Sequence, residues 1–148
     1  MNANDTTTTD LQWNVLTIKR PGLVRDLPPG KEELRWVANS STLISGERDA
    51  ILVDTFLTTE QSQTLSDWIV ASGKNLTAIY ITHGHGDHFF GLASLLERFP
   101  RARAVATPEV VKAMSICHPP GSRTSGDGFS RARFRIACWL PNRWKTKS

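Results

Sequence analysis

The stretch that decides the fold is Ile81–Leu92, ITHGHGDHFFGL, which holds three of the chain's four histidines and one aspartate within six residues. His83, His85 and Asp87 alternate along it, so an extended backbone would send their side chains to one side. His88 follows Asp87 directly, so on an extended backbone its side chain would point to the opposite side. It joins the other three only if the chain turns. Imidazole nitrogens and a carboxylate that converge on one point suit a borderline cation, for which zinc is the usual choice. We therefore predict that His83, His85, Asp87 and His88 bind metal.

Other origins of such a cluster are weaker. A single histidine is most often a surface or hydrogen-bonded core residue, a glycine-containing loop is often only a turn, and an expression tag can mimic a row of ligands. This cluster lies inside the chain, Gly84 and Gly86 separate its ligands, and an apolar run precedes it. Because glycine allows a tight backbone path, these features favour the metal site.

The flanking residues alternate between strand and helix patterns. Leu76–Thr82 is a short apolar run typical of a buried strand, and it leads directly into the histidines. Leu92–Phe99 has apolar residues at helical spacing and ends before Pro100. Ala102–Ala106 then predicts a strand, and Thr107–Met114 a helix that opens with an N-cap and a proline. The histidines thus lie at the carboxyl end of a strand, where α/β proteins bind ligands.

The residues before this segment predict the first strands and a helix. Leu11–Lys19 has the composition of a strand. Thr42–Ser45 and Ala50–Asp54 are two further strands, joined as a hairpin by Gly46–Asp49. Thr58–Gly73 predicts an amphipathic helix, with Thr58 as N-cap and Gly73 as C-cap.

Length and composition indicate one ordinary domain. The chain has 148 residues, 39% of them hydrophobic and 22% charged. It has no apolar run of about 18 residues that could cross a membrane, and its first ten residues are polar, without an apolar signal segment. The two cysteines, Cys117 and Cys138, fit a reducing compartment. We therefore expect a cytoplasmic protein with no membrane partner.

The positive charge of the chain belongs to its last segment. Residues 1–117 carry 11 Lys and Arg against 13 Asp and Glu, whereas residues 118–148 carry 7 against 1. A basic patch such as Arg131–Arg135 could bind nucleic acid. No nucleic-acid-binding module surrounds it, and Gly, Ser, Pro and Arg dominate without a persistent helical or strand period. We therefore favour a basic, irregular tail over 118–148 and expect no nucleic-acid partner.

The motif also carries a resemblance to a known family. His83-Gly-His-Gly-Asp-His88 matches the H-x-H-x-D-H signature of the metallo-β-lactamase superfamily, and the order of strands and helices around it resembles that family's N-terminal half. The resemblance implies an α/β fold, the αβ/βα sandwich, of which residues 11–117 would form the N-terminal αβ half.

The resemblance further implies roles for individual residues. His83 and His85 would bind a first zinc ion, and Asp87 and His88 would serve a second. Asp54, at the end of ILVDT, would steady the motif loop from behind the ligands, although an ordinary aspartate at a strand end would look the same.

The chain departs from the family after residue 117. Family members are considerably longer, and their second half supplies a further histidine for each metal and a bridging aspartate. Here the only later histidine is His118 and the only later acidic residue is Asp127. His118 could replace a ligand, but a loop histidine fits its context better. We expect a truncated product that holds one zinc ion more readily than two.

Two functions stay open. The first is a zinc-dependent hydrolase, in which the metal lowers the pKa of bound water toward about 7 for attack on an ester, thioester, lactam or phosphodiester of a small-molecule substrate. Asp87 would orient that water or accept its proton. The second is a metal-binding fragment with little catalysis, acting through a partner chain or as a relic. In the family a second sheet covers the first; residues 118–148 cannot replace it, so we also expect self-association through an exposed sheet face.

Overall fold

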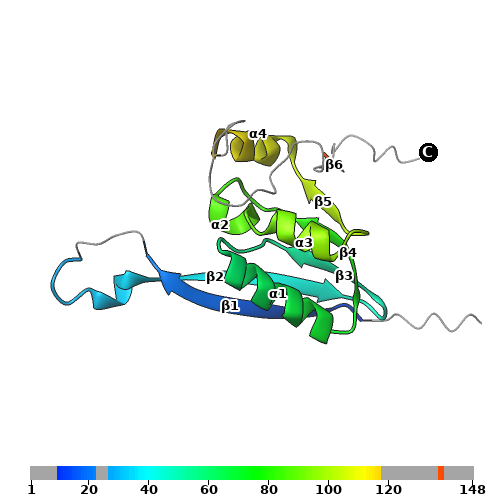
Figure 1. Cartoon of the computed structure of the whole chain (residues 1–148), viewed down its shortest axis with the longest axis horizontal. Helices are drawn as coiled ribbons and strands as arrows, with labels where there is room; N and C mark the ends of the chain where they lie inside the picture. Colours follow the sequence, from blue (N-terminus) through cyan, green and yellow to red (C-terminus); the bar gives the residue numbers. More distant parts are fainter. Residues whose placement is uncertain (1–9, 23–26, 118–136, 139–148) are drawn as a thin grey trace, which may run out of the picture.

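The computed structural model describes residues 10–22, 27–117 and 137–138, and within them one mixed sheet carries helices on one face (Figure 1). The strands are β1 (Gln12–Pro21), β2 (Trp36–Ser45), β3 (Asp49–Val53), β4 (Asn75–Tyr80), β5 (Arg103–Ala106) and β6 (Ala137–Cys138). The helices are the 3-10 helix η1 (Glu32–Arg35) and the α-helices α1 (Thr59–Ala71), α2 (Gly86–Phe89), α3 (Leu92–Arg98) and α4 (Pro108–Cys117). The predicted α/β class is confirmed.

The strands follow one another across the sheet in chain order, β1-β2-β3-β4-β5-β6. β1, β2 and β3 pair antiparallel, and β3, β4, β5 and β6 pair parallel. The parallel pairs follow from the helices that return the chain between strands. The carboxyl ends of β3 and β4 therefore lie side by side, and the segments that leave them can build one site.

The predicted hairpin between β2 and β3 is confirmed, but β2 is longer than the apolar pattern indicated. The turn closes where the Gly46 amide donates to the Asp49 carbonyl at 3.0 Å. β2 begins at Trp36 instead of Thr42, because its first half pairs with β1. That half includes Asn39, Ser40 and Ser41, so hydrophobic periodicity could not reveal it.

The hydrophobic core lies between the sheet and the helices. A row of paired residues, Leu43, Leu52, Ile79 and Ala104, crosses β2 to β5 on the buried face. Side chains from α1 and α3 are buried in the same core; these are Leu65, Ile69, Leu92 and Leu95. Full burial of a leucine or isoleucine contributes about 1.5–3 kcal/mol, so this layer holds the helices against the sheet.

The opposite sheet face is open in the described part of the chain. Trp13 pairs with Ile44, which pairs with Ile51, so these three residues share the face turned away from the core. Trp13 is 70% exposed and Ile51 is 43% exposed, and Val15 on the same face is 47% exposed. β3 and β4 are therefore buried mainly on their helix side, in line with the exposed sheet face expected from the sequence.

The predicted helix after β3 forms with its expected N-cap. Thr58 and Gln61 make a capping box, in which each side chain accepts a hydrogen bond from the other's backbone amide. At the other end Ser72, and not Gly73, is the C-cap. Gly73 follows it with φ +68°, a left-handed conformation that glycine adopts at low cost.

The basic segment is described only at Ala137–Cys138, which pairs with β5 as β6. Its other residues, including His118, Asp127 and Arg131–Arg135, lie outside the described residues, so the division into 11–117 and a basic, irregular tail over 118–148 stays a prediction. Among the described helices, none has the length and apolar character needed to cross a membrane.

Candidate metal centre

The loops that follow β3 and β4 bring four of the predicted residues together. One ligand atom from each of Asp54, His83 and His88 lies within 4.8 Å of the others. The rings of His83 and His88 have centroids 4.0 Å apart, and the rings of His83 and His85 meet edge to face at 4.9 Å. The three neighbouring histidines of the motif therefore form one cluster, with Asp54 beside it.

A single helical turn, α2, brings His88 into the cluster. The backbone is extended at His85 and becomes helical from Gly86, where the His88 amide donates to the His85 carbonyl at 2.9 Å. The predicted alternation of side chains along an extended backbone therefore ends at His85. Asp87 lies on the helical turn instead of on an extended chain, and its Oδ2 is still only 3.9 Å from Nε2 of His88.

Close packing against α4 fixes the path of the motif loop. A Cβ atom on Gly84 would lie 2.5 Å from the Ala113 Cβ and 2.9 Å from backbone atoms of α4. Glycine is therefore required at this position by contact with a neighbouring helix. Phe89, fully buried, anchors the other end of the turn in the core.

Asp54 is held rigidly at the end of β3. It is buried and has φ +61°, a backbone conformation uncommon for residues other than glycine. Its amide donates to the Tyr80 carbonyl at 2.8 Å, and its carbonyl accepts from the Ser41 hydroxyl at 2.8 Å. Its carboxylate is thereby aimed at the loop that follows β4.

The carboxylate of Asp54 orients two imidazoles. Oδ1 accepts from the Thr82 amide at 2.8 Å, and Oδ2 accepts from the Thr82 hydroxyl at 2.7 Å. Oδ2 also lies 3.1 Å from Nδ1 of His88, and the Thr82 hydroxyl oxygen lies 2.9 Å from Nδ1 of His83. The Thr82 hydroxyl has one proton, and it donates that proton in its hydrogen bond to the Asp54 carboxylate. Toward His83 the Thr82 oxygen can only accept, so Nδ1 of His83 is the donor.

This chain of hydrogen bonds fixes the tautomers of both rings. Because Nδ1 donates in His83 and in His88, each neutral ring carries its lone pair on Nε2. Metal-binding histidines usually donate their other ring nitrogen to a carboxylate or its equivalent in this way. The donor set therefore fits zinc, and the hydrogen bonds of Asp54 suit an orienting group better than a direct ligand.

Asp87 faces a different set of partners. Its Oδ2 accepts from Nδ2 of Asn39 at 2.8 Å and from Nη2 of Arg20 at 3.1 Å. Burial raises the pKa of the Asp87 carboxyl, but the hydrogen bonds from Asn39 and Arg20, together with the positive charge of His88 when that ring is protonated, outweigh it, so the pKa lies below its usual range. Asp87 is therefore held as a carboxylate.

Sequence reasoning missed Arg20, Asn39 and Thr82. Arg20 and Asn39 lie on β1 and β2, on the core side of the sheet, and nothing in their local sequence indicates that they meet Asp87. Thr82 precedes the first histidine directly, and that position is the one available signal for it.

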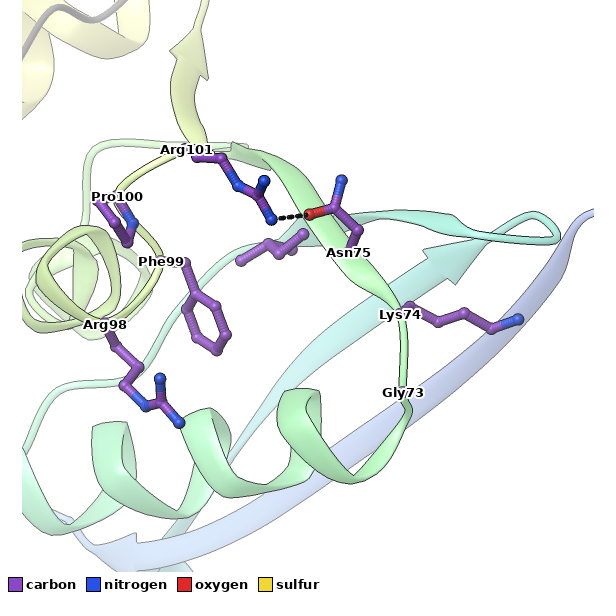
Figure 2. A pocket seen from close by; sticks show the side chains of 8 residues that line it. Gly73, Lys74, Asn75, Arg98, Phe99, Pro100 and Arg101 are labelled. Atoms are coloured by element: carbon purple, nitrogen blue, oxygen red, sulfur yellow. Dashed lines mark hydrogen bonds between the residues drawn. The ribbon is translucent and has the colours of Figure 1, made fainter.

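A separate hollow of about 360 Å³ lies at the other end of β4 (Figure 2). It is lined by Lys74, Arg98 and Arg101 among others, and Arg101 donates to Oδ1 of Asn75 at 3.3 Å. Asn75 begins β4, whereas the histidines follow its end. This hollow therefore takes no part in the candidate metal centre.

Known proteins resemble this chain over its described core. The sequence profile of the metallo-beta-lactamase superfamily matches residues 34–114, more than half of the chain. The hydroxyacylglutathione hydrolase of Shewanella pealeana is 31% identical over 84 residues, which cover 57% of this chain and 31% of that protein. The enzyme of the same name from Francisella tularensis subsp. novicida is 34% identical over 80 residues, which cover 51% and 30%. The chain thus spans less than a third of the length of these relatives.

Solved structures agree with this family at the level of the fold. The metallo beta lactamase from Hirschia baltica superposes with a TM-score of 0.52 at 19% identity, over 72% of this chain and 48% of that one. VMB-1 superposes with a TM-score of 0.53 at 23% identity, over 74% and 48%. At these identities the likeness shows the fold alone. Because the family profile covers more than half of its residues, this chain belongs to the metallo-β-lactamase superfamily and is related to that superfamily's hydrolases.

Proposed function

We propose that this chain is a zinc-dependent hydrolase whose metal is held by His83, His85, Asp87 and His88. The observation that carries the proposal is that Asp54 orients two of the histidine rings. It contacts His88 directly and reaches His83 through the Thr82 hydroxyl. It leaves Nε2 of both rings as lone-pair donors. Zinc bound there would lower the pKa of a water molecule toward about 7 and polarise the bond to be cleaved.

The residues of the chain have distinct parts in this proposal. His83, His85 and His88 bind as neutral imidazoles. Asp54 holds the rings in place, so that little motion is needed when the ion arrives. Asp87, a carboxylate beside His88, orients the attacking water or accepts its proton.

The substrate we propose is a small acyl compound. The two relatives named above are hydroxyacylglutathione hydrolases, which supports an acyl derivative of a thiol as the first substrate class to test. An ester, a lactam and a phosphodiester complete the test panel, because one fold supports many chemistries.

A second candidate is a metal-binding chain with little or no catalysis of its own. It is kept because the chain spans less than a third of the curated relatives it matches. Zinc content and turnover, measured on the same sample, separate the two candidates: both retain metal, and only the first hydrolyses a substrate.

The proposed ligands are tested by elemental analysis of the purified full chain. The parent should retain zinc, and the double change His83→Ala with His85→Ala should lose it. His118→Ala is the matched control, since it removes the chain's fourth histidine, which lies outside the motif in sequence and is expected to be a loop residue, and should leave the zinc content intact. Equal zinc content in the double variant and the parent would show that the assignment is wrong.

A further inference from the structure

Arg20 connects the first strand to the motif loop, 67 residues further along the chain. Its Nη2 donates to Oδ2 of Asp87 at 3.1 Å, and its Nε donates to Oδ1 of Asn39 at 3.1 Å. The Arg20 side chain is only 14% exposed, and Asn39 is 5% exposed. A largely buried guanidinium therefore faces Asp87 in a fixed geometry.

These contacts occupy one oxygen of the Asp87 carboxylate. Oδ2 accepts hydrogen bonds from Arg20 and from Asn39, which together use the two acceptor positions of a carboxylate oxygen. The guanidinium carries a positive charge, so it also balances the negative charge of Asp87. Oδ2 of Asp87 therefore attracts an added cation less strongly than the oxygen of a free carboxylate would.

We propose that Arg20 is the counter-cation of Asp87 and limits the metal centre to one tightly bound divalent ion. The inference rests on the proposed zinc function and specifies how many ions the centre holds. The proposed ion can use Oδ1 of Asp87. A second ion would need the other oxygen, Oδ2, because the oxygens of Asp54 already accept hydrogen bonds from Thr82 and His88. Oδ2 already accepts from Arg20 and Asn39, so a second ion there would meet the guanidinium directly, where two cations repel strongly in a partly buried setting.

The competing explanation is that Arg20 only fastens the edge strand β1 to the rest of the molecule. In that case loss of Arg20 would destabilise the fold and leave the number of bound ions unchanged. The counter-cation role makes the opposite prediction for metal binding, because removal of the charge should admit a second ion. Metal titration therefore distinguishes the two roles without any measurement of activity.

The experiment is a zinc titration of the chelator-stripped full chain, in competition with a chromophoric zinc indicator. The parent should bind one tight equivalent. In Arg20→Gln, which removes the charge and keeps a hydrogen-bonding amide, a second equivalent should bind at least about tenfold more tightly than in the parent. Circular dichroism checks the fold, and Arg20→Met, which keeps an aliphatic stem, replaces the variant if the glutamine form does not fold.

Two controls isolate the position of the charge. Lys19→Gln removes one positive charge from the adjacent, exposed position on β1 and should titrate like the parent. Arg20→Lys keeps the charge and should also hold one equivalent. Two tight equivalents in the parent, or identical titrations of the parent and the neutral Arg20 variant, would overturn the inference alone. A parent that binds no zinc would instead refute the proposed function, and the inference with it.

Discussion

Nδ1 of His88 lies 3.1 Å from Oδ2 of Asp54, and this contact joins residues 34 positions apart through the ends of β3 and β4. It couples the folding of the parallel strands to the orientation of a metal-binding ring. The sheet therefore builds the site directly, because the two carboxyl ends must be neighbours before the ring can be held.

Replacement of Asp54 by asparagine should weaken zinc binding by about 10- to 100-fold, the usual cost of losing a partner that orients metal ligands. An amide has one oxygen and an NH2 group that only donates, so it cannot accept all three hydrogen bonds that the carboxylate takes from the Thr82 amide, the Thr82 hydroxyl and His88. Competition titration with a zinc indicator measures the change. Asp49→Asn is the matched control, since Asp49 is an exposed carboxylate at the start of β3. An affinity equal to that of the parent would exclude an orienting role for Asp54.

Replacement of Gly84 by alanine should lower the free energy of unfolding by about 1–3 kcal/mol, the typical cost of overpacking. The new methyl group would meet Ala113 and the backbone of α4. Thermal and denaturant unfolding of the metal-free chain measure the effect. Gly46→Ala, where an added Cβ would meet only Leu11 at 3.9 Å, should be nearly neutral. The double variant Gly84→Ala with Ala113→Gly should recover part of the lost stability. If Gly84→Ala alone causes no loss, the packing of Gly84 against Ala113 is looser than described.

Replacement of Asp87 by asparagine should reduce kcat by about 10²- to 10⁴-fold, the usual contribution of a general base, with a smaller effect on KM. The amide can accept hydrogen bonds but cannot accept a proton from water. Steady-state kinetics on a thioester, with zinc content measured alongside, test the role. Glu109→Gln, an exposed carboxylate in the first turn of α4, is the control. Unchanged kcat in a zinc-loaded Asp87 variant would remove Asp87 from the reaction.

The open sheet face should make the full chain self-associate and bind a hydrophobic dye such as ANS. Trp13, Val15 and Ile51 contribute exposed apolar surface there, and contiguous apolar patches beyond a few hundred Å² usually mark an interface. Trp13→Lys with Ile51→Lys should shift sedimentation velocity profiles toward the monomer. Leu34→Lys changes an equally exposed residue on η1, away from this face, and should not. A compact monomeric parent without dye binding would contradict the prediction.

The sequence was sufficient for the parts of the fold that depend on local patterns. The apolar runs that became β3, β4 and β5, and the capping residues Thr58 and Thr107, are read within one element. The first half of β2 escaped notice because three consecutive polar residues, Asn39, Ser40 and Ser41, interrupt its apolar pattern. Its partner is β1, and strand pairing between distant segments leaves no local signal.

The candidate site could also be predicted only in part from the sequence. The four residues of the motif could be named because they are close together in sequence, and Asp54 because the family resemblance implied its role. From the sequence we could say only that His88 joins the cluster if the chain turns after His85. The helical turn that begins at Gly86 depends on packing by Phe89 and α4, which the local sequence does not show. Arg20 and Asn39 could not be found, because only the register of β1 against β2 places them beside Asp87.

Arg20 and Asn39, the two hydrogen-bond donors to Asp87, differ in their position relative to the segment that the superfamily profile matches. The region matched by the family profile begins at residue 34, so Asn39 lies inside it and Arg20 lies outside it. One partner of Asp87 thus lies inside the matched segment, and the other lies on a strand that precedes it. If Arg20 has the proposed role, a protein with the same histidine motif and a neutral residue at this place on its first strand should bind a second ion more readily than this chain.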